Sequence, residues 1–405
     1  MTSSVLLRIA SMASRFLLLL LLTRYSPVAV VAQYGVLTGL VSSATFFLGF
    51  DLYIQTSRNI RRPTLFRHYL SNQIVFFAIG LLSLSVFLTF RPKTSIPIMT
   101  VVVILIADFL LQESTRLVLA TGAYRSANVL QFLRQGAWPA LSAIVVLVWH
   151  GTARDIGGVC TIWAVTDGLG LIAAGVLIRK AILPFVFAPS LRLFRAALPR
   201  QAMIFTSSLS LLLFSGLDRV ILGSSSPPRF VAGYVFFSSL FGVVNTLIYS
   251  GLINPYFAAL TDKMVPWAAK RALLRRFGLA VTVFATGMSL MLVLAADVFL
   301  SHIGRAEYKS VEYLRWYFAA FVIVSSCGLI PHFALYAKRD DRAIAIASAI
   351  ATFVFLATWA TLHLWHVRDA MPITIIVSAI ALAATKLAAF TKRHGALGLL
   401  RLEAA

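Results

Sequence analysis

Hydrophobic segments fill this chain almost from end to end, and short polar gaps rich in Lys and Arg separate them. A membrane-spanning helix needs about 20 mainly apolar residues, because each residue advances the helix by only ~1.5 Å. Applied to the 405 residues, this rule predicts about twelve spanning helices, at 6–24, 33–52, 68–90, 96–120, 127–149, 157–178, 199–222, 230–254, 275–298, 312–336, 343–365 and 371–390.

The composition indicates a chain that is solvated by lipid rather than by water. Hydrophobic residues make up 60% of it and the mean hydropathy is +0.88, which is more apolar surface than one soluble core can bury. The polar gaps are far shorter than the ~50 residues of a folded domain, so we expect no enzyme. Cys160 and Cys327 lie in apolar segments without CxxC spacing, so we expect no metal site and no cofactor.

Charge is distributed unevenly between the two sides of the predicted spans. The chain has 36 Lys and Arg residues against 14 Asp and Glu, a formal net charge of +22. In a soluble protein this would suggest nucleic acid, but here the cations lie between spans, where they set orientation and meet anionic lipid. If the N-terminus is cytoplasmic, most of them fall in cytoplasmic gaps, including 58–67, 179–200, 263–276 and 338–342. We therefore expect a multi-pass protein with both termini cytoplasmic, membrane lipids as partners and no nucleic acid.

The first apolar run is expected to be retained as a span rather than removed as a signal peptide. Arg24 and Pro27 separate it from the small residues that a cleavage site needs.

The two halves of the chain begin with similar short motifs. Leu22-Thr23-Arg24 and then Gln33-Tyr34-Gly35 in the first half correspond to Leu217-Asp218-Arg219 and then Ala232-Gly233-Tyr234 in the second. Six spans per half give both halves the same orientation in the membrane. The sequence therefore predicts an all-α membrane protein of two six-helix bundles related by a pseudo-two-fold axis along the membrane normal. These are 1–185 and 186–405, with an interfacial linker at 186–198.

Two predicted spans carry polar stripes. Asp108, Gln112 and Arg116 recur every four residues, and Glu113 can pair with Arg116. The next span carries polar or amphipathic residues at helical spacing, namely Asn128, Gln131, Gln135, Trp138 and Ser142, with Arg134 beside them. Charged groups at membrane depth are costly. They either line a wet cavity or join helices through ion pairs and packing contacts, and the sequence leaves both interpretations open.

Other spans carry single polar residues. Arg15 lies well inside the first span, and Arg24, nine residues on, points to about the opposite side at ~100° per residue. Later spans contain Asp167, Asp218, Arg219 and Asn245. Arg24 and Arg219 lie at helix ends, where snorkelling to the interface is the alternative interpretation.

Short motifs along nearly the whole chain resemble those of a known family, the polysaccharide or O-antigen flippases of the multidrug/oligosaccharidyl-lipid/polysaccharide (MATE-like) exporter superfamily. The motifs are Ser14-Arg15, Thr23-Arg24, Gln33-Tyr34-Gly35-Val36, Ala197-Leu198-Pro199, Leu217-Asp218-Arg219-Val220-Ile221-Leu222-Gly223, Ala232-Gly233-Tyr234 and Glu307-Tyr308. The chain departs from the family in lacking an acidic residue after Ser26-Pro27.

The resemblance implies a twelve-helix exporter of the bacterial inner membrane that serves polysaccharide or lipopolysaccharide synthesis. It would move an undecaprenyl-pyrophosphate-linked oligosaccharide across that membrane by alternating access, in company with a polysaccharide polymerase and other export components. The alternatives are another MATE-like transporter (a drug/cation antiporter or a peptidoglycan lipid flippase) and a membrane glycosyltransferase or polymerase. The last two need a large external loop, and the sequence offers none.

Such an exporter would need cations for the pyrophosphate and, if an ion gradient drives it, acids inside the membrane. The candidates for a substrate cavity are Arg15, Arg24, Arg116, Arg134, Gln131, Gln135, Arg219 and Asn245. The candidates for ion coupling are Asp108, Glu113, Asp167 and Asp218.

Overall fold

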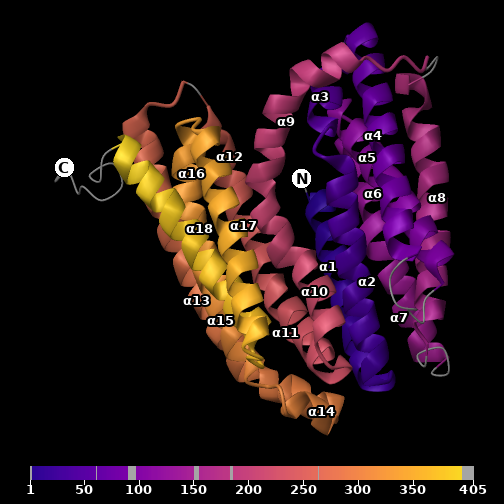
Figure 1. Ribbon diagram of the computed structural model, residues 1–405, viewed down its shortest axis with the longest axis vertical. Helices are drawn as coiled ribbons and strands as arrows, with labels where there is room; N and C mark the ends of the chain where they lie inside the picture. The colour runs from indigo at the N-terminus through magenta and orange to yellow at the C-terminus, as the bar shows by residue number, and fades with distance from the viewer. Residues whose placement is uncertain are drawn as a thin grey trace. The chain divides into compact units, whose positions relative to one another are not determined.

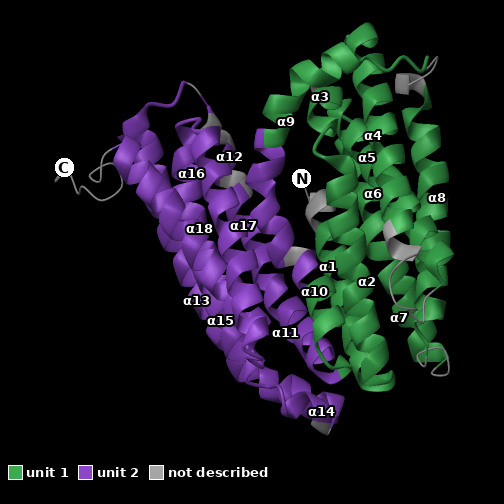
Figure 2. Cartoon of the chain, in the orientation of Figure 1, with its two compact units in different colours: residues 1–202, 219–228 green, residues 203–218, 229–405 purple. Residues whose placement is uncertain are grey.

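The computed structural model describes residues 2–60, 62–89, 97–149, 155–182, 186–262 and 264–394, and every regular element in these ranges is a helix (Figure 1). Ten of the described helical segments are long and apolar enough to cross a membrane. The all-α membrane fold predicted from the sequence is therefore confirmed. The chain divides into two compact units, residues 1–202 with 219–228 and residues 203–218 with 229–405 (Figure 2).

Unit 1 is a helical bundle whose helices approach closely at glycines. Leu111 fills the space beside Gly170 and joins a buried core with Val118 and Leu130. A side chain at Gly223 would overlap that of Val36, so the glycine lets α10 approach α2. The described elements are α1 (Thr2–Tyr25), α2 (Val28–Gly49), α3 (Tyr53–Arg58), α4 (Pro63–Thr89), α5 (Ile98–Ala120), α6 (Tyr124–Phe132), η1 (Leu133–Ala137), α7 (Trp138–Val148), α8 (Ile156–Ile182), the start of α9 (Leu191–Leu212) and most of α10 (Asp218–Ser225).

Unit 2 has α11 in its core, and the residues of this helix from Phe230 to Phe237 are all buried. Gly233 lets Val311 approach this helix, and the Tyr234 and Phe318 rings meet edge to face at 4.9 Å between centroids. The described elements are the rest of α9, η3 (Leu213–Leu217), α11 (Pro228–Leu247), η4 (Ile248–Ile253), α12 (Asn254–Thr261), α13 (Trp267–Ile303), α14 (Ala306–Lys309), α15 (Leu314–Cys327), α16 (Leu329–Ala337), α17 (Asp341–Leu364) and α18 (Ala370–His394).

Three predicted spans are interrupted helices. The span predicted at 127–149 consists of α6, η1 and α7, the one at 199–222 of α9, η3 and α10, and the one at 230–254 of α11, η4 and the first residue of α12. In each, a single π-helical turn joins two α-helical parts, a feature often found at functional sites.

Several predicted helix ends were wrong. The second helix begins at Val28 instead of 33, because Pro27 starts it: the Pro27 carbonyl accepts the first backbone hydrogen bonds, from Val30 and Val31. The ninth begins at Trp267 instead of 275, so the basic segment after Pro266 is the first part of a long helix. Likewise, α9 begins at Leu191 and includes part of the linker expected at 186–198.

Candidate functional site

A salt bridge lies near the middle of the membrane-spanning helices of unit 1. Arg134 Nε and Nη2 donate to Asp108 Oδ1 and Oδ2 at 2.9 and 2.8 Å, and Thr45 Oγ1 donates to Asp108 Oδ2 at 3.3 Å. Asp108 is buried. The two parallel hydrogen bonds fix the guanidinium plane against the carboxylate. One acid thus joins α2, α5 and η1, and its partner is Arg134 rather than Arg116 of its own helix.

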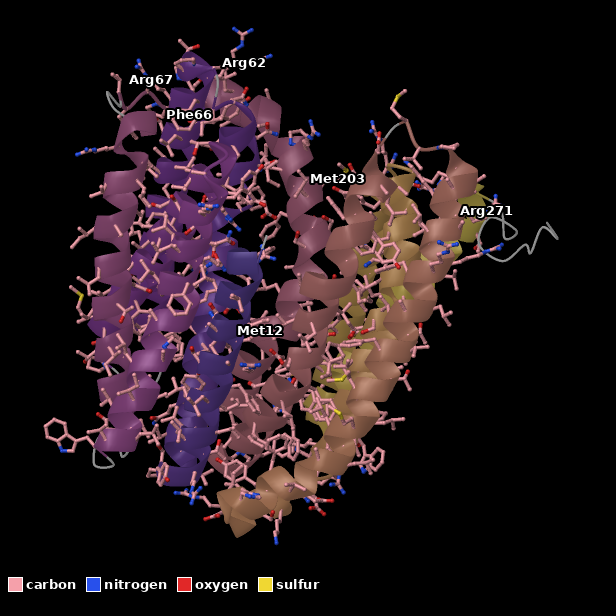
Figure 3. All side chains as sticks on the ribbon, turned by 180° about the vertical axis from the view of Figure 1, so that it is seen from behind. Met12, Arg62, Phe66, Arg67, Met203 and Arg271 are labelled. Carbon is pink, nitrogen blue, oxygen red and sulfur yellow. The ribbon has the colours of Figure 1, made fainter. Side chains whose placement is uncertain are left out.

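Arg15 is held beside this pair by a main-chain contact. Its Nε donates to the Gln135 carbonyl oxygen at 2.8 Å. Within the described part of the chain its two Nη groups donate to no protein acceptor, and the side chain is exposed on unit 1. Arg15 sits midway along the span Leu6–Tyr25, with Met12, three residues earlier, labelled in Figure 3. With Nε held by this bond, the two Nη groups remain available as hydrogen-bond donors.

Pro139, which follows the π-helical turn, explains why this acceptor is available. In an α-helix the amide of residue 139 would donate to the Gln135 carbonyl, and in the wider π register to that of Arg134. Residue 139 is proline, which has no N–H. Arg15 Nε donates to the first carbonyl and Trp138 Nε1 to the second, at 3.1 Å.

Asp167 of α8 completes the cluster. It is fully buried, lies beside the Trp163 indole, and interacts electrostatically with Asp108, Arg134 and Arg15. The Trp163 ring stacks on Trp138 at 4.1 Å between centroids. Two carboxylates this close in apolar surroundings repel each other, and cations or a proton relieve that repulsion.

A second arginine approaches the same region from α10. Arg219 and Arg15 both interact electrostatically with Tyr34, which is buried on α2. Arg219 Nε is buried without an acceptor in the described residues. The cluster therefore combines three arginines with the carboxylates of Asp108 and Asp167, so its formal charge is positive when both acids are ionised.

Glu113 and Arg116 belong to a different network. They form the expected pair, and Glu113 also accepts from Gln73 Nε2. Gln73 Oε1 accepts in turn from Thr56 Oγ1 at 3.0 Å. The Arg116 guanidinium lies 3.8 Å from the centroid of the Tyr53 ring, and burial raises the pKa of Tyr53 while Arg116 opposes that rise. These contacts tie α3, α4 and α5 together, which favours the structural interpretation of this pair.

The remaining candidates lie elsewhere. The Arg24 guanidinium is 5.4 Å from the centroid of the neighbouring Tyr25 ring, at a helix end. In unit 2 the buried Tyr234 hydroxyl donates to Asp218 Oδ2 at 2.6 Å. Gln131 and Asn245 make no polar contact within the described ranges, and Gln135 contributes its carbonyl rather than its amide.

Sequence reasoning missed Trp163 and the burial of Lys386. Trp163 stacks on Trp138 beside the arginines, and its only signal was its place on the predicted span that also carries Asp167. Lys386 in unit 2 is only 7% exposed and lies near His332. Nothing in the sequence indicated that contact.

Comparison with known proteins identifies the fold. No family profile and no curated protein matches the sequence. Among solved structures, the chain is similar to an inward-facing multidrug resistance MATE family transporter of the MOP superfamily, with a TM-score of 0.66 and 11% identity over 96% of this chain and 97% of that one. It is also similar to a MOP superfamily transporter from Pyrococcus furiosus whose binding pocket is described as having reverse polarity, with a TM-score of 0.55 and 14% identity over 96% and 95%. A MATE in complex with MaL6 gives a TM-score of 0.51 and 12% identity over 96% and 95%. The chain is a multi-pass membrane protein with the fold of these transporters.

Proposed function

We propose that this protein is a flippase that exports an undecaprenyl-pyrophosphate-linked oligosaccharide across the bacterial inner membrane by alternating access. The observation that carries the proposal is Arg15, which is anchored at mid-span by its Nε while its Nη donors stay open. A planar guanidinium with two free donors matches the oxygens of a pyrophosphate. The isoprenoid tail of such a substrate can stay in lipid.

The other arginines support an anionic substrate. Arg219 lies near the same Tyr34. Arg134, by contrast, donates two parallel hydrogen bonds to Asp108 and serves to shape the site. A cation exporter would instead require open carboxylates where Arg15 lies. The oligosaccharide, the carrier lipid and the polymerase partner come from the motif resemblance and belong to the proposal.

Asp167 is the best candidate for ion coupling. It is buried next to Asp108, and Arg15 lies within electrostatic range of it. A proton or sodium ion taken up here would change the field at the substrate-binding arginine, which links an ion gradient to substrate affinity.

A cation or drug antiporter is the second candidate function. Two mid-span acids, Asp108 and Asp167, favour it, and it agrees with the printed description of a structural neighbour as a multidrug resistance transporter. A peptidoglycan lipid flippase would share the pyrophosphate chemistry of the first proposal.

A binding experiment separates these functions. Purified protein would be incubated with undecaprenyl pyrophosphate, uncharged undecaprenol or a cationic dye, and bound ligand measured by native mass spectrometry. We expect retention of the pyrophosphate lipid alone, with at least about tenfold weaker retention by Arg15→Ala and no change in the control Arg62→Ala, at the exposed end of unit 1 (Figure 3). Preferential binding of the dye, lost in Asp167→Asn, would establish the antiporter instead.

A further inference from the structure

Three cationic side chains gather around a tryptophan at one end of unit 2. Lys338, which follows α16, places its Nζ 3.8 Å from the centroid of the Trp267 ring in the first turn of α13. Lys270 and Arg271, one turn further along α13, both interact electrostatically with Lys338. Arg271 is labelled at this end of the unit in Figure 3. The three side chains are named here the Lys338 cluster.

The cations of the Lys338 cluster repel one another. Burial lowers the pKa of Lys338, and Arg271 and then Lys270 lower it further. A set of like charges held this close is unfavourable unless an anion lies among them. The cluster is therefore arranged to gain stability from an anion that the protein itself does not supply.

The described carboxylates leave the cluster unneutralised. Asp340, the nearest in sequence to Lys338, accepts from Arg393 Nη1 at 2.6 and 2.7 Å and caps α17 through Ala343 N at 3.1 Å. Lys270 is only 7% exposed, yet it forms no hydrogen bond or ion pair with any described residue. Arg271 Nε is likewise buried without an acceptor in that part of the chain.

The surroundings of the cluster suit a lipid. It lies where the spans Trp267–Ile303 and Leu314–Ala337 end, on the side that the charge distribution assigns to the cytoplasm. Tryptophan is enriched at this depth of a bilayer. Met264, in the turn before α13, is 88% exposed, so this end of the helix is open to its surroundings.

We propose that Lys270, Arg271 and Lys338 bind the phosphate of an anionic phospholipid of the cytoplasmic leaflet, with Trp267 at the level of the headgroup. The site belongs to unit 2, shares no residue with the Arg15 site, and stands whatever substrate that site carries. Bound lipid would hold the start of α13 to the end of α16 and would neutralise the Lys338 cluster.

The test measures thermal unfolding of the purified full-length protein in uncharged detergent during titration with phosphatidylglycerol, phosphatidylcholine or inorganic phosphate at constant ionic strength. We expect the melting temperature to rise with phosphatidylglycerol alone and to saturate. The double variant Lys270→Gln/Lys338→Gln should raise the half-saturating lipid concentration by about tenfold. Equal stabilisation by phosphatidylcholine, or by inorganic phosphate, would overturn the lipid proposal.

A matched control separates a site from general surface charge. Arg342→Gln removes one exposed cation from the same end of unit 2 without touching the cluster, and it should leave the half-saturating concentration within about twofold. Should the double variant fail to fold, Arg271→Gln alone, at a half-buried position, serves instead and should weaken binding several-fold. A loss in Arg342→Gln equal to that in the cluster variant would show attraction by bulk charge and refute the site.

Discussion

Arg15 Nε lies 2.8 Å from the Gln135 carbonyl oxygen, and this contact depends on Pro139. Because proline cannot donate a main-chain hydrogen bond, the helix loses one competitor for that carbonyl, and an arginine from another helix donates to it. The interruption between α6 and α7 thus supplies the carbonyl that holds Arg15. This contact fixes the position of the proposed pyrophosphate donor before substrate binds.

Replacing Pro139 with alanine should weaken this arrangement. The new amide supplies a donor for the Gln135 or Arg134 carbonyl, favours a regular α-helix and competes with Arg15. We expect stability to change little or rise slightly, while transport by protein reconstituted in vesicles falls several-fold. Pro199→Ala, at a proline inside α9, is the comparison. Unchanged transport by Pro139→Ala would show that the proline does not position Arg15.

Removing one member of the Asp108–Arg134 pair should lower the free energy of unfolding much more than replacing both members with apolar residues. Asp108→Ala leaves a buried guanidinium without its carboxylate, which should cost about 3–5 kcal/mol of unfolding free energy. Asp108→Leu/Arg134→Met removes both charges and should recover most of that loss. Unfolding of the single and double variants in mixed micelles measures the coupling; additive losses would mean that the two residues do not act as a pair.

Lys386 should be a destabilising residue. It is 7% exposed and has no hydrogen-bond or ion-pair partner among the described residues, with His332 nearby. Lys386→Met keeps the volume of the side chain and removes the buried charge, so we expect stabilisation by about 1–3 kcal/mol. The exposed Lys392, on the same helix, gives the control Lys392→Met, which should change stability little. If Lys386→Met instead destabilises the protein, the lysine has a partner.

The Tyr313–Asp369 hydrogen bond should give a pH-dependent contribution to stability. Tyr313 donates to Asp369 Oδ1 at 2.7 Å, and burial, followed by this bond and the Asp369 charge, raises the pKa of Tyr313. A raised folded-state pKa means that the stabilisation is complete below the ordinary pKa of about 10 and declines as the pH rises beyond it.

We therefore expect Tyr313→Phe to cost about 1 kcal/mol at neutral pH, and the difference from wild type to shrink above about pH 10. Melting temperatures of both proteins from pH 8 to 11 provide the measurement. A difference that grows with pH would reverse the sign and contradict the assignment.

The sequence predicted the helices well because apolar length is a local property. It predicted their beginnings less well: Pro27 and Pro266 each start a helix at once, whereas the predicted spans begin only at 33 and 275. The π-helical turn was visible only as Pro139, and periodicity alone does not distinguish a bend from a regular span.

The pairing of polar groups was harder to predict, because partners lie on different helices. Asp108 and Arg116 share a stripe, yet Asp108 binds Arg134 while Arg116 binds Glu113. Helical spacing shows which residues share a face and not which helix that face meets. The burial of Lys386 was missed for the same reason.

The most direct test of the central claim is flipping of a fluorescent undecaprenyl-pyrophosphate oligosaccharide by the purified protein in vesicles, scored by the fraction that becomes accessible on the far side. We predict flipping by the wild type, at least about hundredfold slower flipping by Arg15→Ala, and partial recovery in Arg15→Lys. Equal rates for the wild type and Arg15→Ala, both proteins being inserted and folded, would contradict the account.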